Sequence, residues 1–330
     1  MVKYLLLILI LSSSVDVSGQ DNTFRFMFYN VENLFDTIDN PAKRDESFTP
    51  KGEYHWNKYK YNTKLQHIYK TIMSVKEWEE LPLIGLCEIE NHRVLNHLLY
   101  KTPLYQYNYH VIHQDSPDER GIDVALLYQA EYVEILDRRF ISIRFPFDTT
   151  DKTRDILYVK TLLSGNDSLH IFLNHWPSRY GGYMQTQPKR NYVAKVLAHT
   201  IDTLFNESSE SNILIAGDFN DALGDESIEL LIKEVTTTRL KSLPLSSSSR
   251  PGTLKYRSQW QHFDQIIVSQ GLMSKKGLSL TQNQISTGKA SFLIQKDNRY
   301  QGWKPFRYLQ GPKYIGGYSD HLPIFIDIRR

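Results

Sequence analysis

The sequence has a single cysteine, Cys87, in the stretch LIGLCEIE. One cysteine cannot form an internal disulfide, and a zinc site built from several thiolates is excluded for the same reason. The apolar neighbours of Cys87 would raise the pKa of its thiol, which argues against a nucleophilic role. We therefore expect Cys87 to be a small buried residue of the core.

The chain also has little net charge, because 39 Lys and Arg against 37 Asp and Glu leave only +2. A strongly basic nucleic-acid coat protein is thereby excluded, and any anionic partner must meet local charge. Apolar residues make up 41% of the 330 residues, which is enough for a sizeable core. Since no repeat or compositional break divides the sequence, we expect one domain.

Long apolar runs are missing as well. The N-terminal run, residues 4–11, follows Lys3 and is too short to span a bilayer. Val17 and Gly19 fit a signal-peptidase site, with a buried N-terminal helix as the alternative interpretation. We expect residues 1–19 to be a signal peptide and residues 20–330 to be exported, to the periplasm or the medium. Stable membrane insertion is not expected.

Short apolar segments with polar breaks dominate the remainder and predict many strands. They cover residues 24–29, 82–90, 105–113, 121–128, 132–143, 156–163, 169–175, 212–218, 263–269 and 321–328. Helical spacing predicts long helices over residues 59–76 and 191–205, and shorter ones near residues 94–99 and 226–235. The lysines of the first helix are expected to form a solvated face. The pattern favours stacked sheets with helices outside.

Polar side chains lie at the ends of several of these strands, where most follow the strand and Asp264, Asp320 and His321 start or precede one, and a rigid scaffold can position a site at such points. They are Asn30, Glu88, Glu90, His175, Asp218, Asn220, Asp264, Asp320 and His321. Taken singly, each is also common turn, capping or core chemistry. Together they form an oxygen-rich set that suits Mg²⁺ or Mn²⁺. Asp221, the last residue of GDFND, is interpreted as part of a turn.

Six motifs carry a resemblance to a known superfamily: YNVEN, LCEIEN, NHWPSR, GDFND, FDQIIVS and SDHLPI. Their order resembles that of the endonuclease/exonuclease/phosphatase superfamily, which includes deoxyribonuclease I. The surrounding stretches ESFTPKGEYHW and YIGGYSDHLP resemble its exported subgroup from Bacteroidetes-type bacteria. The resemblance extends from about residue 24 to 328. It implies a four-layer α/β sandwich, in which two mixed β-sheets are flanked by α-helices.

The resemblance also implies a divalent-metal-dependent phosphoester hydrolase in which an activated water attacks phosphorus. The implied metal-binding residues are Asn30, Glu88 and Asp320, with Mg²⁺ or Mn²⁺ as the cofactor. The implied catalytic residues are His175, Asp218, Asn220, Asp264 and His321. In this scheme Asp264 orients His321, Asp218 orients or deprotonates the water, and Asn220 and His175 contact phosphate oxygens.

Three arginines are expected to contact substrate. Arg120 resembles an arginine that some family nucleases place near the phosphate. Arg179 and Arg307 are chosen from the loops around SRYGG and NRYQGWKPFRYLQGPKY. The second of these loops and residues 246–260 interleave aromatic residues with cations, which suits nucleic acid but equally a phosphorylated headgroup or simple loop packing.

We therefore expect an exported nuclease or phosphodiesterase that acts as a monomer on a phosphoester, with nucleic acid as the favoured substrate. A phosphatase or phospholipase-like headgroup hydrolase on the same site is the alternative. A non-catalytic binding module would predict loss of a residue such as Glu88, Asp218, Asp264 or His321, and all four are present. The natural substrate, the choice of metal, endo or exo action and the general base are left open by the sequence.

Overall fold

The structure is a computed structural model. It describes residues 23–163, 167–205, 211–274 and 277–330. The predicted signal peptide, residues 1–19, lies outside the described residues. Among the described helices, none combines the length and apolar character needed to cross a membrane.

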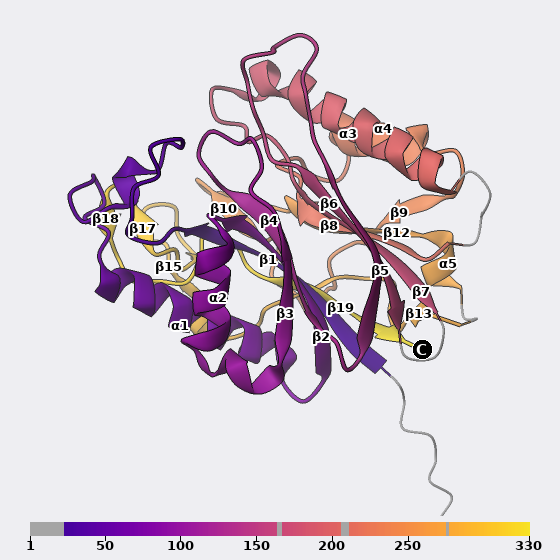
Figure 1. Cartoon of the computed structure of the whole chain (residues 1–330), viewed down its shortest axis with the longest axis horizontal. Helices are drawn as coiled ribbons and strands as arrows, with labels where there is room; N and C mark the ends of the chain where they lie inside the picture. The colour runs from indigo at the N-terminus through magenta and orange to yellow at the C-terminus, as the bar shows by residue number, and fades with distance from the viewer. Residues whose placement is uncertain (1–22, 164–166, 206–210, 275–276) are drawn as a thin grey trace, which may run out of the picture.

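Two sheets form the centre of the molecule (Figure 1). The first has seven strands, in the order β13-β19-β1-β2-β4-β3, with β14 also paired to β19. These strands are β1 (Thr23–Leu34), β2 (Glu80–Ile89), β3 (Tyr109–His113), β4 (Asp123–Gln129), β13 (Ser279–Leu280), β14 (Ser286–Thr287) and β19 (Ile324–Arg329). The second has six strands, in the order β5-β6-β7-β8-β12-β9. They are β5 (Val133–Ile141), β6 (Ile156–Leu163), β7 (Ser168–His175), β8 (Ile213–Asp218), β9 (Leu240–Ser242) and β12 (Asp264–Ser269).

Helices and short ribbons complete the fold. The α-helices are α1 (Lys58–Lys76), α2 (His92–Tyr100), α3 (Tyr183–Phe205), α4 (Glu226–Glu234) and α5 (Gln270–Met273). The 3₁₀ helices are Glu46–Phe48, Pro103–Tyr107 and Ser291–Leu293. The two-stranded ribbons join β10 (Leu254–Tyr256) to β11 (Gln259–Gln261), β15 (Ile294–Lys296) to β16 (Trp303–Pro305), and β17 (Leu309–Gln310) to β18 (Lys313–Tyr314).

The layers are held together by three hydrophobic cores. Because side chains alternate along a strand, each sheet presents apolar residues to both faces. Phe26 of β1 and Ile171 of β7 lie in the core between the sheets. Met27 of β1 packs with residues of α1 and α2, and Phe172 of β7 packs with residues of α3 and α4. Figure 1 shows the helix pairs on opposite outer sides, so the expected four-layer α/β sandwich is confirmed.

The strand directions bring the predicted polar ends to one edge. β1 runs parallel to β2 and β7 runs parallel to β8, so each pair ends on the same side of its sheet. β12 runs antiparallel to β8 and starts with Asp264 opposite Asp218. β19 starts opposite Phe28, and the preceding loop therefore brings His321 to the end of β1.

Three local expectations differ from the structure. The predicted strand over residues 105–113 begins only at Tyr109, because the preceding residues form a 3₁₀ helix that starts at Pro103. Helix α3 starts at Tyr183, well before the expected residue 191, and continues through Pro188. Lys64 in α1 is buried, contrary to the expected solvated lysine face. Its ammonium donates to the carbonyl of Tyr318 at 2.6 Å, and an internal acceptor of this kind compensates for burial.

Candidate active site

A buried histidine–aspartate pair lies at the centre of the site. His321 Nδ1 is 2.7 Å from Asp264 Oδ2, and its Nε2 is 3.7 Å from Asp218 Oδ2. The hydroxyl of Ser319 fixes this loop, because it accepts from the His321 amide and donates to the carbonyl of Asn30 at 2.8 Å. One ring nitrogen is therefore held by a carboxylate while the other faces Asp218.

Asn30 and Glu88 lie beside the same aspartate. The amide nitrogen of Asn30 donates to Asp218 Oδ2 at 3.0 Å and to Glu88 Oε1 at 3.4 Å. Glu88 has a left-handed backbone with φ 63° and interrupts the pairing of β2 with β4 between Cys87 and Ile89. Such an irregularity re-aims a side chain, and a left-handed non-glycine residue costs free energy that the surrounding structure must offset. The strain at Glu88 thus accompanies a carboxylate directed into the site.

His175, at the end of β7, completes the inner group. Its Nε2 is 3.8 Å from Glu88 Oε1 and 3.8 Å from Asp218 Oδ2. Its Nδ1 is buried without a hydrogen-bond partner among the described residues. A neutral ring with its proton on Nε2 would therefore offer that proton toward the two carboxylates.

The two histidines have opposite electrostatic environments. Burial and the cations Arg154 and Arg120 hold the pKa of His175 well below its usual range. Burial also disfavours a charged His321, but the carboxylates of Asp264 and Asp218 outweigh it and raise the pKa of His321 well above its usual range. Near neutral pH one ring is neutral and the other is an imidazolium. Burial raises the pKa of Asp218, and this makes it a stronger base than an exposed aspartate.

A second charged group lies next to these residues and centres on Arg307. Its guanidinium contacts Glu32 at 2.8 Å and Asp320 at 3.2 Å. Burial and Asp320 raise the pKa of Glu32 to about 8, while Arg307 opposes the shift. Burial lowers the pKa of Lys64 to about 7, although Glu32, Asp320 and Glu88 act in the opposite direction. Neither Glu32 nor Lys64 was predicted from the sequence as a residue of the site. The only sequence signal for Glu32 is that an acidic residue occurs within an apolar strand.

The other two predicted substrate arginines have different surroundings. Arg120 is exposed and donates to the side-chain oxygen of Asn33 at 2.6 Å. The Asn33 amide in turn donates to Glu88 Oε2, so Arg120 lies close to the site. Arg179 contacts Asp221 at 2.8 Å and Asp225 at 2.5 Å. Its guanidinium is thus engaged by two carboxylates, and a contact with substrate stays a prediction for both arginines.

Asn220 and Asp221 follow Asp218 in a tight turn. Asn220 has φ 51°, its amide donates to Asp218 Oδ1, and its side-chain nitrogen donates to the carbonyl of Trp176. Asp221 is fully buried and lies 2.7 Å from the buried Arg190. Asp221 lies in the turn between β8 and α4, as the sequence predicted, and it also neutralises an arginine inside the fold.

The acidic groups fit a divalent cation. Glu88 and Asp320 offer carboxylates and Asn30 an amide, the oxygen donors that Mg²⁺ and Mn²⁺ prefer. Glu32, Asp320 and Glu88 all act to raise the pKa of the buried Lys64. Single ligand atoms from Asp218, Asp264 and His321 also lie within 4.8 Å of one another. Either side of Asp218 could therefore hold an ion.

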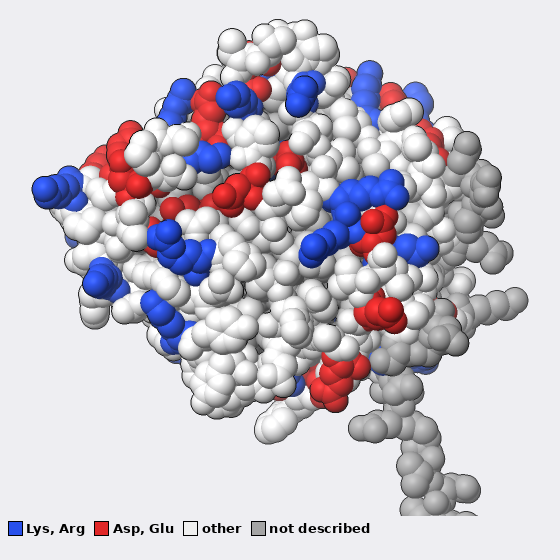
Figure 2. All heavy atoms as spheres, in the orientation of Figure 1, with Lys and Arg blue, Asp and Glu red and all other residues white. Residues whose placement is uncertain are grey.

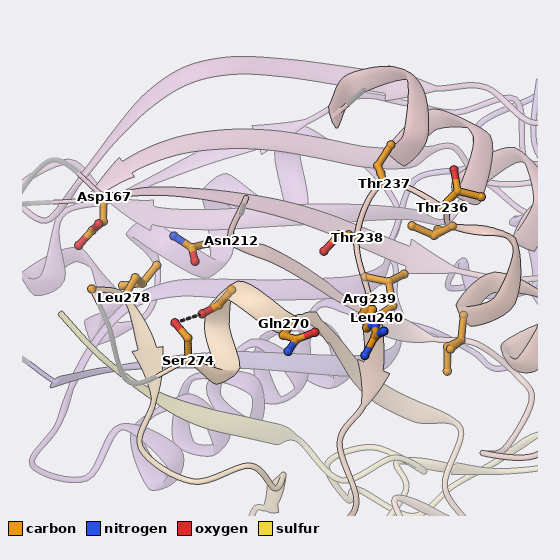
Figure 3. Close-up of a pocket in the computed structure, with 14 residues that line it drawn as sticks. Asp167, Asn212, Thr236, Thr237, Thr238, Arg239, Leu240, Gln270, Ser274 and Leu278 are labelled. Carbon is orange, nitrogen blue, oxygen red and sulfur yellow. Dashed lines mark hydrogen bonds between the residues drawn. The ribbon is translucent and has the colours of Figure 1, made fainter. Parts of the chain in front are cut away.

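A large cavity of the described part lies away from these residues. It has a volume of about 840 Å³ and is lined by Asn212, Gln270 and their neighbours (Figure 3). Asn212 precedes β8, whereas Asp218 ends this strand, so the cavity is at the opposite end of the sheet from His321. Its lining includes neither a histidine nor a glutamate. Figure 2 shows acidic and basic side chains interspersed over the viewed face, in agreement with the small net charge.

Comparison with known proteins identifies the family of this chain. The chain belongs to the endonuclease/exonuclease/phosphatase family, whose model matches residues 25–330. This is a family of phosphoester hydrolases, and the resemblance seen in the motifs is confirmed. Among proteins with curated functions, none matches this sequence.

Several solved structures share the fold. A family member from Bacteroides thetaiotaomicron is 12% identical with a TM-score of 0.58, covering 94% of this chain and 98% of its own. The mannosyl-6-phosphatase Bt3783 of the same species is 13% identical with a TM-score of 0.58, covering 93% and 100%. D. rerio TDP2, solved with a single-stranded DNA product, is 13% identical with a TM-score of 0.55, covering 94% and 100%. At these identities the likeness shows the fold.

Proposed function

We propose that this chain is an exported, divalent-metal-dependent phosphodiesterase that cleaves nucleic acid. The main support is the arrangement around Asp218. His321 is 3.7 Å from this carboxylate and is held by Asp264 at 2.7 Å, while Asn30 bonds both Asp218 and Glu88. Export is proposed from the character of residues 1–19 alone.

The residues divide the chemistry as follows. Asp218 accepts the proton of the attacking water, because burial raises its pKa and Asn30 and Asn220 hold both of its oxygens. His321, kept cationic by Asp264, donates to a phosphoryl oxygen and neutralises the charge that develops there. His175 stays neutral and donates from Nε2 to another phosphoryl oxygen.

A divalent cation would be held by Glu88 and Asp320, with Asn30 beside them. When bound, such an ion polarises a phosphoryl oxygen as a Lewis acid. The chain's own contribution there is to direct Glu88 inward through the irregularity of β2 and to hold Asp320 with Arg307.

Charge favours a diester over a monoester as the substrate. Arg307 is paired with Glu32 and Asp320, and Arg179 is paired with Asp221 and Asp225. These cations are largely neutralised, so they add little attraction for a phosphate dianion. A phosphodiester carries a single negative charge and needs less compensation.

Exposed aromatic rings on the ribbon that bridges to His321 and on the ribbon beside it favour a nucleic acid. Leu254 of β10 forms a bridge with His321, and Tyr256 of the same ribbon is 62% exposed. Trp303, on the neighbouring ribbon β15–β16, is 48% exposed. Such rings can stack on bases of a single strand, and stacking tolerates any sequence.

The test is a substrate panel with controlled metal. Purified protein is assayed on plasmid DNA, single-stranded DNA, RNA, bis-p-nitrophenyl phosphate, p-nitrophenyl phosphate, sphingomyelin and inositol phosphates, with Mg²⁺, Mn²⁺ or chelator. We expect hydrolysis of nucleic acid and of the small diester, and its loss in chelator. Activity that survives chelation would refute the metal requirement. Preference for the monoester or the headgroup substrates would favour the phosphatase or phospholipase-like alternative.

A further inference from the structure

A second group of potential metal ligands lies where β3 ends and β4 begins. His113 is the last residue of β3 and Asp123 the first of β4, and these strands pair antiparallel. His113 Nε2 is 3.6 Å from Asp123 Oδ2, and its Nδ1 is 3.9 Å from Asp115 Oδ1. Single ligand atoms from the three residues lie within 4.8 Å of one another.

Burial leaves one ring nitrogen of this histidine without a hydrogen-bond partner among the described residues. The side chain of His113 is 1% exposed and that of Asp123 is 3% exposed. His113 Nε2 is buried and has no hydrogen-bond partner among the described residues. The other oxygen of Asp123 accepts from the Ser116 amide at 3.0 Å, which fixes the carboxylate with Oδ2 toward the ring. A buried nitrogen therefore faces a buried, oriented carboxylate oxygen across a gap too wide for a hydrogen bond.

The spacing and the donor types fit a transition-metal dication. Imidazole nitrogen and carboxylate oxygen bind Zn²⁺ at about 2.0–2.2 Å, so two donors of one tetrahedral ion lie about 3.4 Å apart. The observed 3.6 Å between His113 and Asp123 is close to this value. Imidazole is a common ligand of zinc, whereas Mg²⁺ and Ca²⁺ select oxygen. Asp115, whose side chain is 68% exposed, can turn toward the ion as a third ligand.

Solvent and further groups reach this site from one side. A cavity of about 480 Å³ next to it is lined by His92, His113, Gln114, Arg138 and Arg139, among others. The ring of His92 is 6.4 Å from that of His113. Arg139 is 57% exposed and bonded to Asp137, so water and this carboxylate screen its charge from a cation.

We propose that His113, Asp115 and Asp123 form a second cation site, for a dication such as Zn²⁺, that joins the two ends of the loop over residues 114–122. This loop carries Asp118, which pairs with the buried Arg154 at 3.0 Å. It also carries Arg120, which bonds Asn33 beside the proposed active site. The ion closes the base of the loop and thereby positions Arg120.

Bound zinc is the readout that tests this site. Protein stripped with chelator is titrated with Zn²⁺, and zinc per chain is measured after gel filtration. Compared with the wild type, His113→Gln should bind one equivalent less, or bind that equivalent at least ~10-fold more weakly, the smallest effect usual for losing even an outer-shell partner. His110→Gln is the matched control, because His110 is an exposed residue of the same strand. It should bind zinc as the wild type does.

If His113→Gln does not fold, the test uses Asp115→Asn. The Asp115 side chain is mostly exposed, so its replacement should not disturb folding. This variant should also weaken the second equivalent at least ~10-fold and reduce the rise in Tm that zinc produces. Zinc binding by His113→Gln or Asp115→Asn equal to that of the wild type would overturn the proposal. Because this readout is bound metal, such a failure is separate from a failure of the proposed phosphodiesterase activity.

Discussion

Replacing Asp221 with asparagine should destabilise the protein strongly. Both members of the Asp221–Arg190 pair are 0% exposed, and their atoms lie 2.7 Å apart. Arg190 Nη2 has no hydrogen-bond partner among the described residues, so this guanidinium depends on Asp221 for its charge balance. Breaking a fully buried pair by removing one partner costs about 3–5 kcal/mol, because the remaining charge stays buried. Arg179 also contacts Asp221, but it keeps its pair with Asp225 in the variant and so adds little to the loss of stability.

The assay is equilibrium unfolding in urea and by heat, followed by two spectroscopic probes. For a chain of this size the expected loss corresponds to a fall in Tm of roughly 4–7 °C. Asp151→Asn is the control, since its pair with Lys189 is partly exposed (side chains 36% and 23%) and should cost at most about 1 kcal/mol. The double variant Asp221→Asn with Arg190→Met should regain part of the loss. If Asp221→Asn costs no more than Asp151→Asn, the buried pair does not anchor the turn.

Three further predictions concern other parts of the molecule. His321→Ala and Asp218→Asn should each lower kcat at least ~100-fold on the best substrate of the panel, and near-normal turnover in either would contradict the assigned roles. Tyr256→Ala and Trp303→Ala should raise KM for single-stranded DNA, because a stacked base contributes about 1–3 kcal/mol, and leave bis-p-nitrophenyl phosphate unaffected; equal effects on both substrates would count against stacking. Burial lowers the pKa of His170 to about 4, below its value of about 6.5 in the unfolded chain, so its contribution to stability is complete above pH 6.5 and is lost as the pH falls toward 4. In the wild type the free energy of unfolding in urea should fall between pH 7 and pH 4.5, and in His170→Gln this fall should be about 2 kcal/mol smaller. A fall of the same size in both proteins would exclude His170 as the cause.

The sequence predicts the strand ends of the site well, because an apolar segment followed by an acid or amide is a local pattern. Asp218 and His175 are examples, since each is the last residue of a buried strand that the periodicity locates. The buried charged residues are harder to predict from the sequence. Lys64 precedes the apolar Leu65, and its acceptor, the carbonyl of Tyr318, lies 254 positions away. No local pattern can indicate that such a lysine finds an internal partner.

The same limit explains why the buried ion pair of Asp221 was not predicted. Asp221 has the turn chemistry that its neighbours suggest, but its burial is set by Arg190, a residue of a helix packed against the sheet. Glu32 is similar, because Arg307 lies 275 positions further on. Residues whose role depends on a distant charge need the fold before they can be interpreted. Residues whose role depends on a strand end do not.

The pairing of the first and last described strands has a consequence for the timing of activity. Asn30 lies on β1 and His321 just before β19, and the Ser319 hydroxyl joins them across 289 positions. Ribosomal synthesis delivers the N-terminal half first. A nascent or truncated chain that ends before Ser319 therefore has Glu88 and Asp218 but neither His321 nor the hydroxyl that supports Asn30. We therefore expect a chain cut before Ser319 to lack the proposed hydrolytic activity, although it keeps two of the acidic residues of the site.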